Sequence, residues 1–108
     1  MTTSILETVT SAFAAALGRT ELGRSDNFFA AGGDSIGATM ILARIETELG
    51  VALRYRDFLE APTPALLGVT VLIERARQGG DLATEIAALS EADAAVLVAE
   101  LERRGQPL

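Results

Sequence analysis

Residues 22–49 read LGRSDNFFAAGGDSIGATMILARIETEL, a connection rich in turn-forming residues followed by a helix-forming run. Within the run, apolar residues recur three or four positions apart, which predicts the buried face of an α-helix. This stripe comprises Ala38, Ile41, Leu42, Ile45 and Leu49. We expect the helix to begin at Asp34 or Ser35 and to stop at Gly50, because short polar side chains cap helix N-termini and glycine commonly ends helices.

The neighbouring segments predict further helices and no convincing pair of strands. Residues 3–17 show helical apolar spacing, and residues 18–34 hold enough turn formers for a long connection. Residues 54–60 suit a short helix, and residues 63–80 open with Thr-Pro and end with Gly-Gly, as a capped helix does. We therefore expect an all-α fold, a small bundle of three longer helices and one short helix.

The C-terminal residues 81–108 read as an extension of a compact unit formed by residues 1–80. Ser90 and Asp93 match a capping box, and the apolar positions Ala94, Leu97, Val98 and Leu101 predict an additional helix over residues 90–104. The extension has six acidic residues against two arginines, a net charge of −4. Because a short helix is unstable alone, its apolar face must pack on the rest of the chain or bind a basic partner, and Leu97 and Leu101 are candidate contacts.

The composition excludes several classes of function. The 108 residues suit one domain, and the absence of cysteine and histidine removes disulfides, a Ser–His–Asp triad and most zinc chemistry. A net charge of −6 with one tyrosine and four phenylalanines disfavours nucleic-acid binding. No apolar run approaches the ~20 residues of a membrane span, and no secretory signal is recognisable, so we expect a cytoplasmic protein.

Ser35 stands in a Gly-Gly-Asp-Ser motif at the predicted start of a helix. A serine there lies beside unpaired backbone N–H groups and the positive end of the helix dipole, so a phosphodiester formed on its hydroxyl is favourably placed. Gly32 and Gly33 keep the approach free of side chains. Taken alone, the motif is equally compatible with an ordinary N-cap preceded by a flexible turn.

The longer segment 22–36, continued by ATMILARIETELGVALRYRDFLEAPTPALL over residues 38–67, resembles the carrier (thiolation) domains of nonribosomal peptide synthetases, members of the acyl carrier superfamily. The resemblance covers residues 5–78. It implies an acyl-carrier-like bundle with a covalent 4′-phosphopantetheine arm on Ser35, and Asp34, Gly33 and Gly32 as its surroundings. It further implies a non-catalytic domain that holds aminoacyl or peptidyl groups as thioesters on that arm.

The resemblance also implies partners: a phosphopantetheinyl transferase, which takes the arm from coenzyme A, an adenylation enzyme, and condensation or tailoring enzymes. We expect a monomer. Ile36 and Met40 share a face distinct from the core stripe and, with Thr39, are candidates for the docking surface. Tyr55 and Phe58 extend this set. Packing at the rim of the core is an equal alternative for Ile36 and Met40, and Phe58 also suits the core.

Two other functions stay open from the sequence. One is a carrier of aryl or polyketide groups, and the other is an unmodified helical interaction module that uses the acidic extension. Gly37 is unusual just past a helix start, because glycine costs roughly 1 kcal/mol relative to alanine in a helix. It could loosen the first turn or allow a partner to approach closely.

Overall fold

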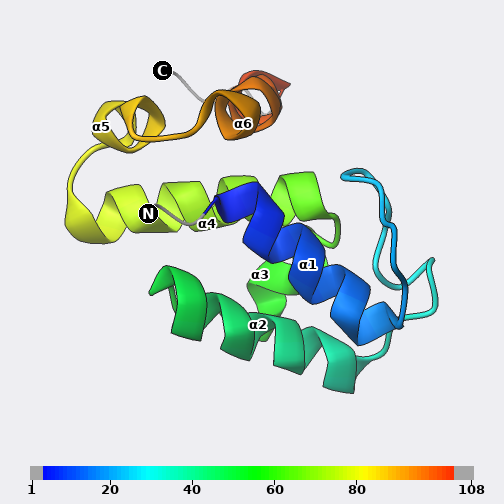
Figure 1. Ribbon diagram of the computed structural model, residues 1–108. Helices are drawn as coiled ribbons and strands as arrows, with labels where there is room; N and C mark the ends of the chain where they lie inside the picture. Colours follow the sequence, from blue (N-terminus) through cyan, green and yellow to red (C-terminus); the bar gives the residue numbers. More distant parts are fainter. Residues whose placement is uncertain (1–3, 104–108) are drawn as a thin grey trace.

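The computed structural model describes residues 4–103, which form six α-helices and no strand (Figure 1). Helix α4 lies at the centre, with α1 crossing it, α2 and α3 on one side and α5 and α6 on the other (Figure 1). The helices are α1 (Ile5–Leu17), α2 (Ser35–Leu49), α3 (Tyr55–Glu60), α4 (Pro64–Gly79), α5 (Leu82–Ala87) and α6 (Glu91–Arg103). The all-α fold is therefore confirmed. None of these helices combines the length and the apolar character needed to cross a bilayer.

The helix ends follow from local sequence. The Ser4 hydroxyl accepts a hydrogen bond from the Glu7 N–H at 3.2 Å, and the Thr63 hydroxyl caps α4 in the same way. Gly18 and Gly50 close α1 and α2 with φ angles of 67° and 72°, a left-handed conformation that glycine adopts without steric cost. The predicted helix ends at residues 3 and 104 lie outside the described residues.

Helix α5 was not predicted. It has six residues, none of them buried, so it has no complete apolar stripe from which to recognise it. Its N-terminus is fixed by Asp81, whose carboxylate accepts a hydrogen bond from the Thr84 N–H at 2.8 Å. That hydrogen bond holds the pKa of Asp81 below its ordinary value, so protonation at low pH removes the cap.

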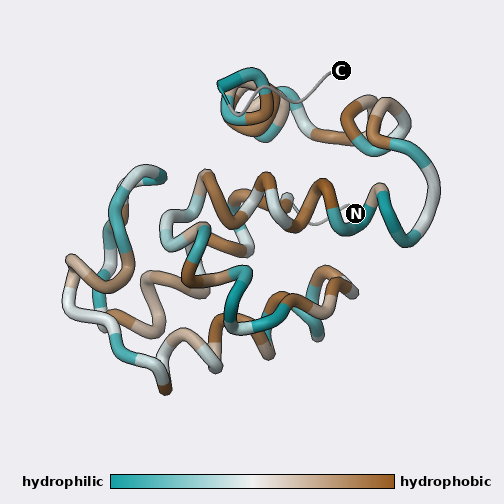
Figure 2. Tube along the Cα trace, turned by 180° about the vertical axis from the view of Figure 1, so that it is seen from behind, coloured by the Kyte–Doolittle hydropathy of each residue, from teal (hydrophilic) through white to brown (hydrophobic). Residues whose placement is uncertain are grey.

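The core is built around three fully buried phenylalanine rings from different parts of the chain. Phe13 comes from α1, Phe28 from the connection 18–34 and Phe58 from α3. Ring centroids lie 5.5 Å apart for Phe13 and Phe28 and 5.2 Å apart for Phe28 and Phe58, both in edge-to-face geometry. Figure 2 shows hydrophobic residues along α4, the helix between this core and α6.

Helix α6 packs on α4 and contributes Leu97 and Leu101 to the same apolar core. Both side chains are fully buried, so the prediction that they contact a partner is wrong. The physical reason is a close approach at Gly68 of α4, where an added Cβ would lie 2.9 Å from Cδ2 of Leu97. A glycine in α4 therefore opens the space that the α6 leucine fills.

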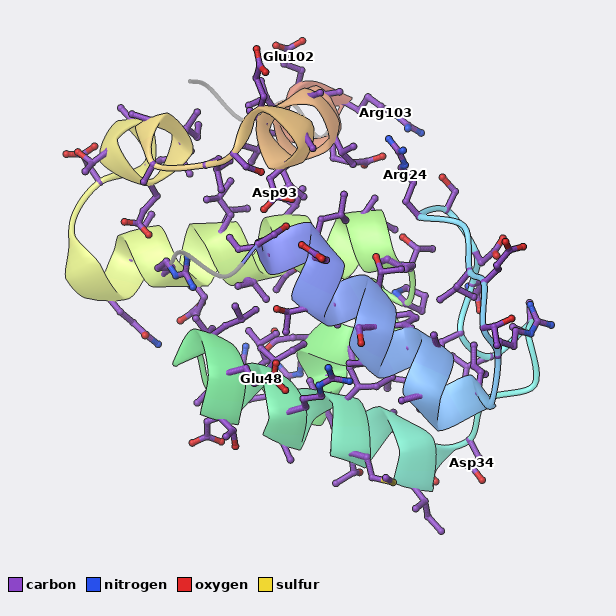
Figure 3. All side chains as sticks on the ribbon, viewed as in Figure 1. Arg24, Asp34, Glu48, Asp93, Glu102 and Arg103 are labelled. Carbon is purple, nitrogen blue, oxygen red and sulfur yellow. The ribbon has the colours of Figure 1, made fainter. Side chains whose placement is uncertain are left out.

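Asp93 joins α6 to the start of α1. Its carboxylate accepts hydrogen bonds from the Ser4 hydroxyl at 2.7 Å and from the Ile5 N–H at 2.8 Å (Figure 3). Only half of the predicted capping box forms, because the Ser90 hydroxyl accepts from the Asp93 N–H while the Asp93 carboxylate caps α1. The buried carboxylate of Asp93 thus connects the C-terminal extension to the first helix by hydrogen bonds.

Asp93→Asn is expected to lower the free energy of unfolding by about 1–3 kcal/mol, the cost of leaving one buried donor without an acceptor. Asparagine keeps the size of the side chain but offers one oxygen to the two donors, Ser4 Oγ–H and Ile5 N–H. Urea denaturation followed by circular dichroism measures the loss. Glu102→Gln removes a charge from an exposed position of the same helix and should change stability by no more than ~0.5 kcal/mol. Equal stabilities of the two variants would contradict the capping role.

Candidate functional site

Ser35 is the first residue of α2, and its side chain is exposed. The residue before it, Asp34, is the N-cap, and its Oδ1 accepts a hydrogen bond from the Gly37 N–H at 2.8 Å. Of the two candidate caps, Asp34 therefore performs the capping, and the Ser35 hydroxyl is left outside the cap. In Figure 3, Asp34 lies at the opposite end of the molecule from Asp93 and the extension.

The start of α2 suits a bound anion. Helix α2 has fifteen residues, and its first turn contains no acidic side chain. Asp34 occupies the Gly37 N–H, so within residues 4–103 the N–H groups of Ser35 and Ile36 are the first-turn donors left for an anion on the serine oxygen. These donors and the positive end of the helix dipole fit a phosphate ester at Ser35.

The two glycines before Asp34 serve different purposes. Gly32 has a φ of 102°, which favours glycine, and an added Cβ would meet nothing within 4 Å. At Gly33, by contrast, an added Cβ would lie 2.2 Å from Cε2 of Phe28. The Gly33 N–H also donates to the Phe28 carbonyl at 2.9 Å. Gly33 is thus required by packing inside the loop, in addition to any role in keeping the approach open.

Ile36 and Met40 lie on the outer face of α2, one turn apart, with exposed fractions of 71% and 62%. This exposure excludes the alternative that they belong to the rim of the core. Thr39, between them, is also exposed, and its hydroxyl donates to the Ser35 carbonyl at 2.9 Å. The side of α2 next to Ser35 is therefore an apolar surface that no other part of the described chain covers.

Helix α3, which contacts α2, adds Tyr55 to the exposed side chains, but Phe58 is fully buried in the aromatic core. The prediction that Phe58 contacts a partner is therefore wrong. Leu59 and Phe29, which were not among the predicted docking residues, are 52% and 36% exposed. Their signal was present in the adjacent pairs Phe28-Phe29 and Phe58-Leu59, in which one residue enters the core and its neighbour faces outward.

The start of α3 is fixed by its own cap. The Asp57 carboxylate accepts from the Arg54 N–H at 2.8 Å and forms an ion pair with the Arg54 guanidinium. Burial raises the pKa of Asp57, but the hydrogen bonds and the charge of Arg54 together lower it below its ordinary value. The cap therefore holds α3 in place at neutral pH and weakens as the carboxyl becomes protonated in acid.

The profile of the family described as phosphopantetheine attachment site matches residues 7–71, more than half of the chain and including Ser35. The chain belongs to the phosphopantetheine attachment family. The predicted family and its covalent 4′-phosphopantetheine cofactor are thereby confirmed. The match ends inside α4, so α5 and α6 of this attachment domain lie beyond it.

Named relatives of the attachment domain include peptide synthetases. This chain is 36% identical over 74 residues, 68% of its own length, to surfactin synthase subunit 3 from Bacillus subtilis. It is 42% identical over 62 residues, 57% of its length, to a phosphinothricin tripeptide synthetase from Streptomyces viridochromogenes. In each case the chain spans only 6% of the relative's length. The similarity to peptide synthetases therefore concerns one small part of each of these large proteins.

A solved structure shares the fold of the attachment domain. It is a type-II acyl carrier protein from Streptomyces verticillus involved in bleomycin biosynthesis, with a TM-score of 0.60 and 33% sequence identity. The alignment covers 62% of this chain and 81% of that chain. The acyl-carrier-like arrangement predicted from the sequence is confirmed by this likeness.

Proposed function

We propose that Ser35 carries the 4′-phosphopantetheine arm and that the domain serves nonribosomal peptide synthesis as a non-catalytic carrier of aminoacyl or peptidyl groups. The observation that supports this most strongly is the exposed Ser35 hydroxyl at the first position of α2, within the residues that match the family. The similarity to peptide synthetases favours amino acids over aryl or polyketide groups. When attached, the arm supplies a flexible tether and a terminal thiol that holds the acyl group as a thioester.

The chain's own residues supply an anchor for that arm. The cap formed by Asp34 leaves the Ser35 hydroxyl available, and the Ser35 and Ile36 N–H groups favour the phosphate that the serine oxygen would bear. The helical body holds this end of α2 rigid, while the arm moves. A tethered acyl group then meets each enzyme at a high effective concentration, so individual docking contacts need not be tight.

We assign the contact with these enzymes to a docking patch around Ser35, defined as the exposed apolar side chains of the loop, α2 and α3. Its members are Phe29, Ile36, Met40, Tyr55 and Leu59. Ile36 and Met40 lie one turn apart beside Ser35, and α3, which contacts α2, presents Tyr55 and Leu59. Exposed apolar surface of this kind marks protein interaction sites. The proposed partners are a phosphopantetheinyl transferase acting with Mg²⁺, an adenylation enzyme, and condensation or tailoring enzymes.

A loading assay tests the proposed function. The domain is incubated with coenzyme A, Mg²⁺ and a phosphopantetheinyl transferase, and then offered aminoacyl, aryl or malonyl groups with the matching loading enzymes. Intact-mass spectrometry follows each addition. We expect the domain to be loaded with the aminoacyl group and not with the aryl or malonyl group. Preferential loading by an aryl or malonyl donor would replace the peptide assignment with another carrier class, and failure of the first step would favour an unmodified interaction module.

Ile36→Glu and Met40→Glu are expected to slow aminoacyl loading about tenfold or more while changing the free energy of unfolding by no more than ~0.5 kcal/mol. Both side chains are exposed, so the added charge disturbs a partner's apolar contacts without opening a cavity in the core. Thr47→Glu adds the same charge at an exposed position further along α2 and serves as the control. Equal loading rates of all three variants would remove Ile36 and Met40 from the docking patch.

A further inference from the structure

Phe28 is held in place from several directions. Its side chain is fully buried and packs edge-to-face against Phe13 of α1 and Phe58 of α3. Its N–H donates to the Pro62 carbonyl, just before α4, at 2.8 Å, and its carbonyl accepts from the Gly33 N–H at 2.9 Å. The position of this ring is therefore set by the core as a whole, although Phe28 belongs to the connection between α1 and α2.

Another side of the same ring lies against the start of α2. An added Cβ at Gly33 would lie 2.2 Å from Cε2 of Phe28, and one at Gly37 would lie 3.0 Å from Cζ of the same ring. Gly33 and Gly37 bracket Asp34, Ser35 and Ile36 in sequence. The ring thus contacts both ends of the turn that presents Ser35.

Packing also explains why residue 37 is a glycine. Gly37 is buried inside α2 and has no left-handed φ angle, so its backbone conformation does not require glycine. Alanine has a higher helix propensity than glycine and would favour the helix. A methyl group there would press on Phe28 Cζ and would also lie 3.3 Å from the Asp34 Oδ1 that caps the turn. The close approach of the Phe28 ring, and not that of a partner protein, therefore accounts for the glycine at residue 37.

We propose that Phe28 is a positioning residue for phosphopantetheine attachment, and that its ring, seated against Gly33 and Gly37, fixes the direction in which the Ser35 hydroxyl is presented. This inference rests on the proposed role of Ser35. In the transfer, the Ser35 oxygen bonds to the phosphorus that bears pantetheine, and the pyrophosphate bond of coenzyme A breaks. Adenosine 3′,5′-bisphosphate leaves, and the hydroxyl proton passes to a base of the transferase.

The orientation of the hydroxyl matters because a displacement of about 1 Å at a reacting group can cost ~100-fold in rate. Gly37→Ala forces either the ring or the first turn of α2 to move by a few tenths of an ångström. The ring is braced by Phe13 and Phe58, so the turn yields. The gain in helix propensity offsets the strain in the folded state, so the change should appear in the transfer rate much more than in stability.

The test compares transfer of phosphopantetheine from coenzyme A, catalysed by one transferase, to the wild type, Gly37→Ala, Phe28→Leu and the double variant. Phe28→Leu removes Cζ and with it the conflict with a methyl group at residue 37. Rates are measured per folded molecule, at a temperature at which circular dichroism shows each protein to be native. Gly79→Ala is the matched control, because Gly79 is a helical glycine whose added Cβ would meet nothing within 4 Å.

We expect Gly37→Ala to lower kcat about tenfold with little change in KM, and Gly79→Ala to match the wild type. In the Phe28→Leu background, the alanine at residue 37 should cause no further loss, because its effect acts through the ring. An unchanged rate for Gly37→Ala would overturn the inference, as would an equal loss with and without the phenylalanine ring. If the wild type accepts no phosphopantetheine at all, the assignment of Ser35 fails instead, so the two failures are distinguishable.

Discussion

Ser35→Ala is expected to abolish attachment of 4′-phosphopantetheine and to leave the fold intact. The substitution removes the proposed acceptor oxygen from an exposed side chain, while the helix cap remains, because Asp34 and not Ser35 accepts the hydrogen bond from Gly37. The free energy of unfolding should therefore change by no more than ~0.5 kcal/mol. Intact-mass spectrometry after incubation with coenzyme A and the transferase measures the attachment, and urea denaturation measures stability.

Ser25→Ala is the control for this experiment, since Ser25 is an exposed serine in the same connection. It should be modified as completely as the wild type. Attachment that persists in Ser35→Ala would mean that another hydroxyl is the acceptor. A variant that lost attachment only because it had unfolded would show itself in the denaturation curve.

Truncation after Gly80 is expected to destabilise the domain by several kcal/mol and to leave little native protein at 37 °C. Full burial of one leucine side chain contributes about 1.5–3 kcal/mol, and the truncation removes both Leu97 and Leu101 from the core. It also removes the Asp93 carboxylate and leaves the Ile5 N–H without its acceptor. These losses are a large part of the ~5–15 kcal/mol that stabilises an ordinary domain.

Comparing Leu97→Ala with Leu89→Ala in the full-length chain shows whether stability is lost because core packing is lost or merely because the truncated chain is shorter. Leu97 is fully buried, so Leu97→Ala should lower the free energy of unfolding by about 2–5 kcal/mol. Leu89 is only half-buried, so Leu89→Ala should lower it by less. We therefore propose that the extension and residues 1–80 unfold as one cooperative unit. A truncated chain as stable as the full chain would contradict this proposal and would return the acidic extension to the role of a separate docking element.

Much of this fold could be predicted from the sequence because its signals are local. The stripe of α2 repeats with the helical period, Gly18 and Gly50 stand where left-handed caps are needed, and Thr63-Pro64 opens α4. The start of α2 was predictable to within one residue for the same reason. The site around Ser35 is a contiguous motif, so its neighbours in space are largely its neighbours in sequence.

The parts that could not be predicted depend on contacts between distant residues. Asp93 caps a helix that begins 88 residues earlier in the chain, and no local pattern indicates such a bond. The sequence also cannot say which of the adjacent residues Phe58 and Leu59 faces the core, because a six-residue helix is too short to show a stripe. Gly37 appeared only as a poor helix former until the position of the Phe28 ring supplied the reason for it.

The role of Ser35 as the attachment residue is tested most directly by locating the modification in the wild-type protein. After incubation with coenzyme A, Mg²⁺ and a phosphopantetheinyl transferase, the protein is digested, and fragmentation mass spectrometry locates the added group. We expect a single 4′-phosphopantetheine on Ser35, in the peptide that contains the Gly-Gly-Asp-Ser motif. A group found on any other hydroxyl, or an unmodified Ser35 in a natively folded protein, would contradict it.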